Sequence, residues 1–244
     1  MKRRNIWLSK LLGTCEKGDD MNNLKRKEIA FFGKITAGIT HEIKNVLAII
    51  QESSGLMEDI IDVTENNAFP HKDKFITSLN RISRQIQRGI DITSSLNRFA
   101  HSPDHCPVSL DLNDIAEQMV VLASRFARLK NVVLESSPSD PPLIIKSDPV
   151  SLEMALFESI EILLNIVSQG GKIILSPRKI QDKCVLGVGY ENIVFSEKEF
   201  MAKVSSTQRW VSLQETMAYL GGIAKVFDLS PEILLYLPES IDNQ

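Results

Sequence analysis

Residues 31–50 read FFGKITAGITHEIKNVLAII, and they set the architecture of the whole chain. Apolar side chains recur in this segment at steps of three and four, the pattern of a helix that packs one face against other helices. These side chains are Phe32, Ile35, Ile39, Ile43, Val46 and Ile50. His41 lies two residues from both Ile39 and Ile43, so at about 100° per residue it points roughly away from them, toward water. Asn45 follows four residues later on the same face, and the carboxylate of Glu42 is expected beside the imidazole on this polar face.

This helix is expected to run from near Asn22 to near Val63, after a break at residues 18–20, and to end in the turn-forming residues 65–70. A second amphipathic run follows. Its apolar residues are Phe75, Leu79, Ile82, Ile86, Ile90, Leu96 and Phe99. Two long amphipathic helices joined by a short polar loop form an antiparallel hairpin. One hairpin cannot cover both apolar seams, so two chains are expected to associate as a homodimer with a four-helix bundle. Packing of the seam on the rest of the same chain is the alternative.

Prolines mark a linker at residues 101–107, and the pattern then changes to alternating helices and strands. Its two histidines, aspartate and cysteine are metal-ligand types, but Pro103 argues against a helical face that holds them, so no metal is predicted. Helices are expected at 112–129, 148–168 and 210–220, and strands at 131–134, 143–145, 172–176, 184–188, 222–227 and 233–237. The order predicts an α+β sandwich with one mixed or antiparallel sheet and helices on one face. The expected domains are a tail at 1–21, the hairpin at 22–103 and the α+β domain at 104–240.

Composition narrows the class of protein further. The formal net charge of −3 gives no support to nucleic-acid binding through a broad basic surface. The cysteines, Cys15, Cys106 and Cys184, have no metal-like spacing and favour reduced thiols in a cytosol. No apolar run reaches the length that a bilayer needs. We therefore expect a cytoplasmic protein without a stable membrane anchor.

Residues 38–45, GITHEIKN, resemble the H-box of bacterial sensor histidine kinases. The resemblance implies that His41 is phosphorylated on a ring nitrogen, that Glu42 assists proton transfer and that Asn45 positions water for dephosphorylation of a response regulator. Val46 stands where the family often has proline, a change expected only to straighten the helix. A solvated surface histidine without chemistry is the alternative interpretation of His41.

The second half of the chain resembles the ATP-binding domain of the same family. The matching landmarks are residues 147–149, 170–173, 220–223 and 234–238. The chemistry for the nucleotide is missing, however. The two Mg²⁺-binding asparagine positions fall on Glu158 and Ile162, and the Asp-x-Gly-x-Gly segment is replaced by residues 190–194, YENIV. The family's phosphate-gripping glycine-rich lid should lie between Phe195 and Trp210, and residues 195–203 contain no glycine. We therefore predict a degenerate ATPase domain that binds neither ATP nor Mg²⁺.

Together these features favour a phosphorelay protein similar to dimeric histidine phosphotransfer proteins. His41 is expected to accept a phosphoryl group from receiver-domain aspartates and to donate it to them, without autokinase activity, the phosphate coming ultimately from an upstream histidine kinase. The arginines of the second helix, Arg81, Arg84, Arg88 and Arg98, form either a solvated face or a surface for an acidic receiver. Three alternatives stay open: a response-regulator phosphatase, a residual histidine kinase, and a dimeric adaptor in which His41 is inert.

Overall fold

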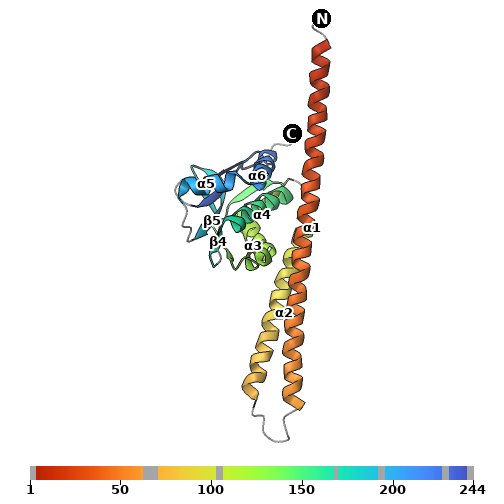
Figure 1. Cartoon of the computed structure of the whole chain (residues 1–244), viewed down its shortest axis with the longest axis vertical. Coiled ribbons are helices and arrows are strands. Elements are labelled where there is room, and N and C mark those ends of the chain that lie inside the picture. The colour runs from red at the N-terminus through yellow and green to blue at the C-terminus, as the bar shows by residue number, and fades with distance from the viewer. Residues whose placement is uncertain are drawn as a thin grey trace.

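The structure is a computed structural model that describes residues 4–62, 71–102, 107–167, 170–191, 196–226 and 231–240. Residues 4–62 and 72–101 form a long rod, and a compact α+β domain packs against the middle of that rod (Figure 1). The antiparallel helical hairpin and the α+β class that the sequence predicts are both confirmed. The predicted turn at 65–70 lies outside the described residues.

The rod consists of α1 (Arg4–Asp62) and α2 (Lys72–His101). Helix α1 begins at Arg4, so the expected start near Asn22 is wrong. Gly13 and Gly18 each weaken a helix by about 1 kcal/mol, but no proline occurs before residue 63 to end it. The helix therefore continues through the expected break. The domain boundary at 21/22 stays a prediction.

The seam between α1 and α2 is narrower than the sequence predicts. It buries Ile35, Ile39 and Val46 from α1, and Ile92 and Phe99 from α2. Four apolar residues of α2 instead point outward, between 43% and 50% exposed: Ile76, Leu79, Ile86 and Ile90. The small polar side chains of Ser78 and Ser95 are buried, whereas these four apolar side chains are not. The stripe of apolar residues on α2 is thus left uncovered within the chain.

The second domain holds two sheets, so the expectation of one sheet is wrong. A five-stranded mixed sheet has the order β2-β4-β5-β7-β6, and β1 pairs with β3 in a separate antiparallel pair. Their bounds are β1 Val108–Asp111, β2 Val133–Ser136, β3 Ile144–Ser147, β4 Lys172–Ile180, β5 Lys183–Glu191, β6 Ile223–Val226 and β7 Glu232–Leu237. Strand β1 was missed because it spans four residues between the linker and a helix. Strand β2 runs parallel to β4 rather than turning back onto β3.

In the described part of this domain the helices are α3 (Leu112–Arg128), α4 (Pro149–Ile166), α5 (Glu197–Ser205) and α6 (Gln208–Tyr219). Asp111 and Asp148 cap α3 and α4, since their carboxylates accept hydrogen bonds from backbone N–H groups of the first turn. Helix α5 was not predicted, although Ser196 and Glu199 form a capping box at its start. It occupies the segment where the sequence analysis looked for a glycine-rich lid.

One hydrophobic core runs without interruption from the hairpin into the second domain. Phe31 of α1 lies 5.4 Å from Phe99 of α2 and 5.4 Å from Phe157 of α4, measured between ring centroids. Phe157 in turn packs edge-on against Phe126 of α3 at 5.2 Å. Tilted and edge-to-face aromatic pairs at these separations stabilise a fold beyond the area that they bury. The second domain is therefore fixed to the helix that carries His41.

Candidate functional site

His41 lies exposed on α1, as the helical pattern predicts. It lies along a shallow groove that a single face of α1 forms. The other residues lining this groove are Phe32, Gly33, Thr36, Ala37, Thr40 and Lys44. Since the groove is built on one face of one helix, its other side is open and the imidazole is reachable from solvent. The hydroxyl of Thr40 donates back to the Thr36 carbonyl at 2.8 Å, so it does not bind the imidazole.

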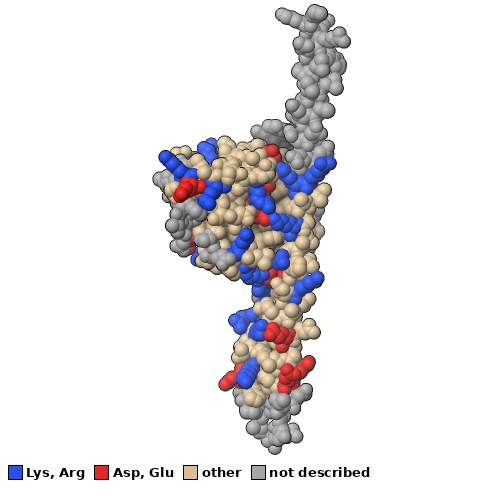
Figure 2. Space-filling model, viewed as in Figure 1, with Lys and Arg blue, Asp and Glu red and all other residues tan. Residues whose placement is uncertain are grey.

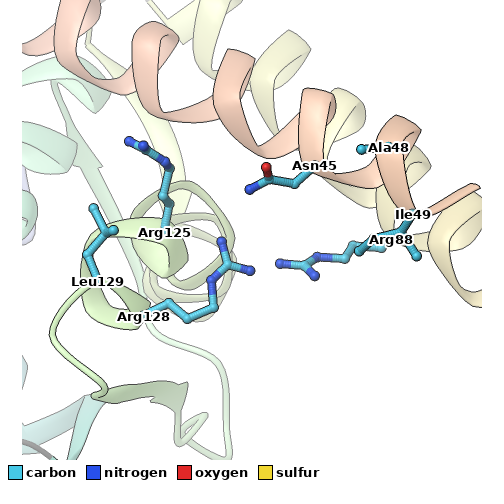
Figure 3. Close-up of a pocket in the computed structure, with 7 residues that line it drawn as sticks. All are labelled: Asn45, Ala48, Ile49, Arg88, Arg125, Arg128 and Leu129. Atoms are coloured by element: carbon cyan, nitrogen blue, oxygen red, sulfur yellow. The ribbon is translucent and has the colours of Figure 1, made fainter. Parts of the chain in front are cut away.

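Asn45 is also exposed, one helical turn beyond His41. It does not line the same groove. Its amide faces a pocket of about 450 Å³ between α1, α2 and α3, where Arg88, Arg125 and Arg128 also lie (Figure 3). The structure thus places His41 and Asn45 on neighbouring parts of one surface.

Glu42 lies elsewhere than the sequence analysis expects. It is 1% exposed and forms ion pairs with Arg88 of α2 and Arg128 of α3. Glu42 comes three residues after Ile39 and four before Val46, and both of these are buried, so it belongs to the packed face of α1. The expectation that its carboxylate shares the polar face with His41 is wrong. The proton-transfer role that the resemblance implies for Glu42 stays a prediction.

Arg125 and Arg128 were missed by the sequence analysis. They lie three residues apart in the last turn of α3, where basic side chains interact favourably with the helix dipole and are common for that reason alone. Nothing local in the sequence relates them to residues 38–45. Their place beside Asn45 follows from the packing of α3 against the hairpin.

A second set of contacts joins α4 and α6 to α1. Lys34 of α1 forms an ion pair with Glu161 of α4, and its ammonium lies 5.2 Å from the Phe157 ring centroid. Arg209 of α6 reaches the same Glu161 at 2.6 Å. Figure 2 shows Lys and Arg side chains gathered where the second domain meets the rod. Basic side chains of α1 and α6 thus converge on one carboxylate of α4 at this junction.

Two carboxyl groups near this junction have raised pKa values, the buried Glu153 and the partly buried Glu28. Glu153 of α4 accepts hydrogen bonds from Gln118 of α3 at 2.8 Å and from Ser102, just after α2, at 3.2 Å. Burial raises the pKa of Glu153 to about 8. Burial, followed by the nearby charge of Asp148, also raises the pKa of Glu28 on α1. The junction thus contains one buried carboxyl group whose raised pKa favours the protonated form at neutral pH.

The two positions where the resemblance places Mg²⁺ ligands are occupied by internal packing. Ile162 is fully buried in the core. Glu158 accepts hydrogen bonds from the α6 hydroxyls of Ser212 at 2.6 Å and Thr216 at 3.5 Å, and burial raises its pKa. Of the segment at 190–194, Tyr190 and Glu191 belong to β5, and the rest lies outside the described residues. The loss of nucleotide binding stays a prediction that this packing supports.

Within the described ranges, no helix is both long and apolar enough to span a membrane. No family model and no curated protein matches the sequence.

Several solved structures resemble the chain. The match to the catalytic domain of histidine kinase ThkA covers 57% of this chain and 100% of the ThkA chain, with 15% identity and a TM-score of 0.46. Histidine kinase AdeS of Acinetobacter baumannii covers 83% of this chain and 98% of that one, with 15% identity and a TM-score of 0.40. ThkA in complex with the response regulator TrrA covers 88% of this chain and 64% of that one, with 16% identity and a TM-score of 0.44. These structural neighbours are histidine kinases or parts of them.

Proposed function

We propose that His41 is the phosphoryl carrier of a phosphorelay, which accepts a phosphoryl group from the aspartate of one receiver domain and passes it to another. The observation that carries this proposal is the exposed imidazole on a groove that one helix face leaves open. A receiver domain needs that access, because its aspartyl phosphate has to come in line with the attacking nitrogen. The rod and the docked second domain hold the helix rigid while the partner binds.

The reaction needs no cofactor from this chain. A ring nitrogen of His41 attacks the phosphorus of the aspartyl phosphate, and the bond from phosphorus to the carboxyl oxygen breaks, which releases the aspartate as a carboxylate. The other ring nitrogen then releases its proton to water. The reverse steps return the phosphoryl group to a second receiver. Positive charge on the adjoining surface favours the approach of an acidic partner, in a manner that salt weakens.

On this proposal the phosphate comes from another protein, and the second domain no longer binds a nucleotide. Two observations support this part of the proposal: Ile162 is fully buried, and Glu158 is hydrogen-bonded to α6. Phosphoryl transfer from ATP requires Mg²⁺ held by oxygen ligands beside the phosphates. An upstream histidine kinase is then the source of phosphate. We place the proposed phosphorelay in the cytoplasm.

Two chains act together as a homodimer. The uncovered stripe of Ile76, Leu79, Ile86 and Ile90 on α2 supports this, since apolar residues at such spacing stabilise helix bundles. Leu47 and Ile61 of α1, at 58% and 55% exposed, add apolar surface. The dimer carries one His41 per subunit.

The decisive test uses a receiver domain that carries a ³²P-labelled aspartyl phosphate. Label is expected to move onto the wild-type protein and not onto a His41→Gln variant. His71→Gln is the matched control, because His71 precedes α2 and its side chain makes no capping hydrogen bond. Label on His41→Gln at the wild-type level overturns the proposal.

The three alternatives predict different results. A residual kinase binds Mg-ATP in calorimetry and labels itself from ATP without a receiver. A phosphatase releases inorganic phosphate from the receiver without a labelled intermediate at His41. An adaptor with an inert histidine retains its full cellular function as the His41→Gln variant.

A further inference from the structure

A pocket one helical turn from His41 is lined by three arginines that come from two different helices (Figure 3). Arg88 comes from α2, while Arg125 and Arg128 come from the last turn of α3. Asn45 of α1, one helical turn beyond His41, also lines the pocket. The apolar part of the lining consists of Ala48, Ile49 and Leu129. Guanidinium groups seldom gather in this way without a counter-charge, because like charges repel one another.

The charge in this pocket is only partly balanced. Glu42 forms ion pairs with Arg88 and Arg128 through one terminal nitrogen of each. Arg125 is half-buried, and its side chain makes no hydrogen bond or ion pair with any residue that the structure describes. Three guanidinium groups against one carboxylate leave two net positive charges around a pocket of about 450 Å³. A dianion is the charge complement of this arrangement.

We infer that this pocket binds a phosphoryl group. The planar guanidinium fork matches the oxygens of phosphate, and charge-assisted hydrogen bonds to such oxygens are among the strongest in proteins. Arg125 has all its donors available, and Arg88 and Arg128 keep those that do not reach Glu42. The amide of Asn45 adds a neutral donor. The Glu42 carboxylate is a positioning group here, since its two oxygens hold Arg88 of α2 and Arg128 of α3 beside each other at the pocket.

Two sources supply this chemistry: free inorganic phosphate, and a phosphoryl group carried on a partner's carboxyl side chain. The pocket is larger than a phosphate ion needs, which leaves space for the carrier atoms. Binding by the pocket is independent of any chemistry at His41. Its use in handing a phosphoryl group to or from His41 rests on the proposed function.

Binding is measured on the full chain through the Nε–H signals of its arginines in ¹⁵N NMR spectra, at constant ionic strength. One titration uses inorganic phosphate and another uses acetyl phosphate, a small acyl phosphate. Saturable shifts of the Arg88, Arg125 and Arg128 signals are expected with at least one of them. A response to acetyl phosphate alone identifies the carboxyl-borne group as the ligand, and an equal response to both identifies the phosphoryl group itself.

The variant Arg125→Ala is expected to weaken binding at least tenfold, and Arg26→Ala less than twofold. Arg26 is an exposed arginine of α1 outside the pocket, so the two variants lose the same charge. Thermal unfolding shows whether Arg125→Ala is folded, and Arg125→Lys is the second variant if it is not. The absence of saturable shifts with both ligands, or equal weakening by Arg125→Ala and Arg26→Ala, overturns the inference. His41→Gln is expected to bind both ligands normally, so a failure of the proposed relay leaves this result intact.

Discussion

Glu42 and Arg128 form an ion pair across 86 positions of sequence, and it ties the histidine-bearing helix to the end of α3. The Glu42 carboxylate is 1% exposed and is shared with Arg88 of α2. Three helices therefore meet at a single carboxylate, immediately after His41 in the chain. Such a group fixes the relative position of the elements that it joins, because an unpaired charge in that place is costly.

Replacement of Glu42 is expected to destabilise the protein. Glu42→Gln leaves two guanidinium groups facing each other without a counter-charge, and loss of one member of a buried pair typically costs about 3–5 kcal/mol. Because the two arginines are partly exposed to solvent, we expect a smaller loss, about 1–3 kcal/mol, in urea unfolding. Glu52→Gln is the control, since Glu52 pairs with Arg81 at 3.2 Å on the exposed surface and its loss costs below about 1 kcal/mol. Equal destabilisation by both variants contradicts a central role for Glu42.

Glu153 makes stability depend on pH. Its pKa is about 8 in the folded chain and 4.5 in its ordinary state, so the folded protein binds more protons between these values. The contribution of Glu153 to the free energy of unfolding is therefore greatest below pH 4.5, and it falls as the pH rises toward 8. Glu153→Gln imitates the protonated carboxyl group and removes this fall. We expect the variant to exceed the wild type by on the order of 1–3 kcal/mol at pH 8 and to match it near pH 5.

Thermal unfolding at pH 5, 6.5 and 8 measures the difference. The Gln118 and Ser102 donors keep an oxygen acceptor in the variant, so its folded geometry is retained. A wild-type to variant difference that stays constant across this range contradicts a protonated Glu153.

Local patterns made much of the fold predictable from the sequence. Asp111 and Asp148 precede apolar helical runs and do cap α3 and α4. The exposure of His41 follows from its spacing relative to Ile39. The same spacing rule also places Glu42 with Ile39 and Val46 on the packed face. The resemblance to an H-box instead led us to expect its carboxylate beside the imidazole.

Other features depend on contacts between distant segments. The pocket requires Arg125 to meet Asn45, and these residues are brought together only by the docking of α3 on the hairpin. Strand β1 is identified by its antiparallel pairing with β3, since its four residues carry little pattern of their own. On α2 the small residues Ser78 and Ser95 are buried, and the larger apolar residues of the stripe face outward. Helical periodicity predicts that an apolar stripe exists on α2, but it does not predict which partner covers that stripe.

Association through the α2 stripe is tested by placing charge on it. The double variant Ile86→Glu and Ile90→Glu is expected to shift the protein from dimer to monomer in sedimentation equilibrium. Both side chains are about half exposed, so the folded monomer tolerates the change, whereas a dimer interface buries two carboxylates per chain without partners. Ile223→Glu in β6 is the control, because Ile223 is 53% exposed on the second domain. A wild-type chain that sediments as a monomer rules out the proposed bundle.

An Asn45 variant distinguishes phosphoryl transfer to His41 from hydrolysis of the receiver's phosphate. The Asn45 amide is exposed one turn from His41 and faces the arginine-lined pocket, so it can orient a water beside a phosphoryl group that the arginines hold. Asn45→Ala is expected to slow release of inorganic phosphate from a labelled receiver about tenfold, equivalent to ~1.4 kcal/mol of barrier, while the rate of labelling at His41 changes less than twofold. Quenched-flow sampling follows both rates in one reaction. Gln51→Ala removes an exposed amide from the same helix and is expected to change neither rate. If Asn45→Ala slows labelling and release equally, Asn45 contributes to receiver binding instead of to hydrolysis.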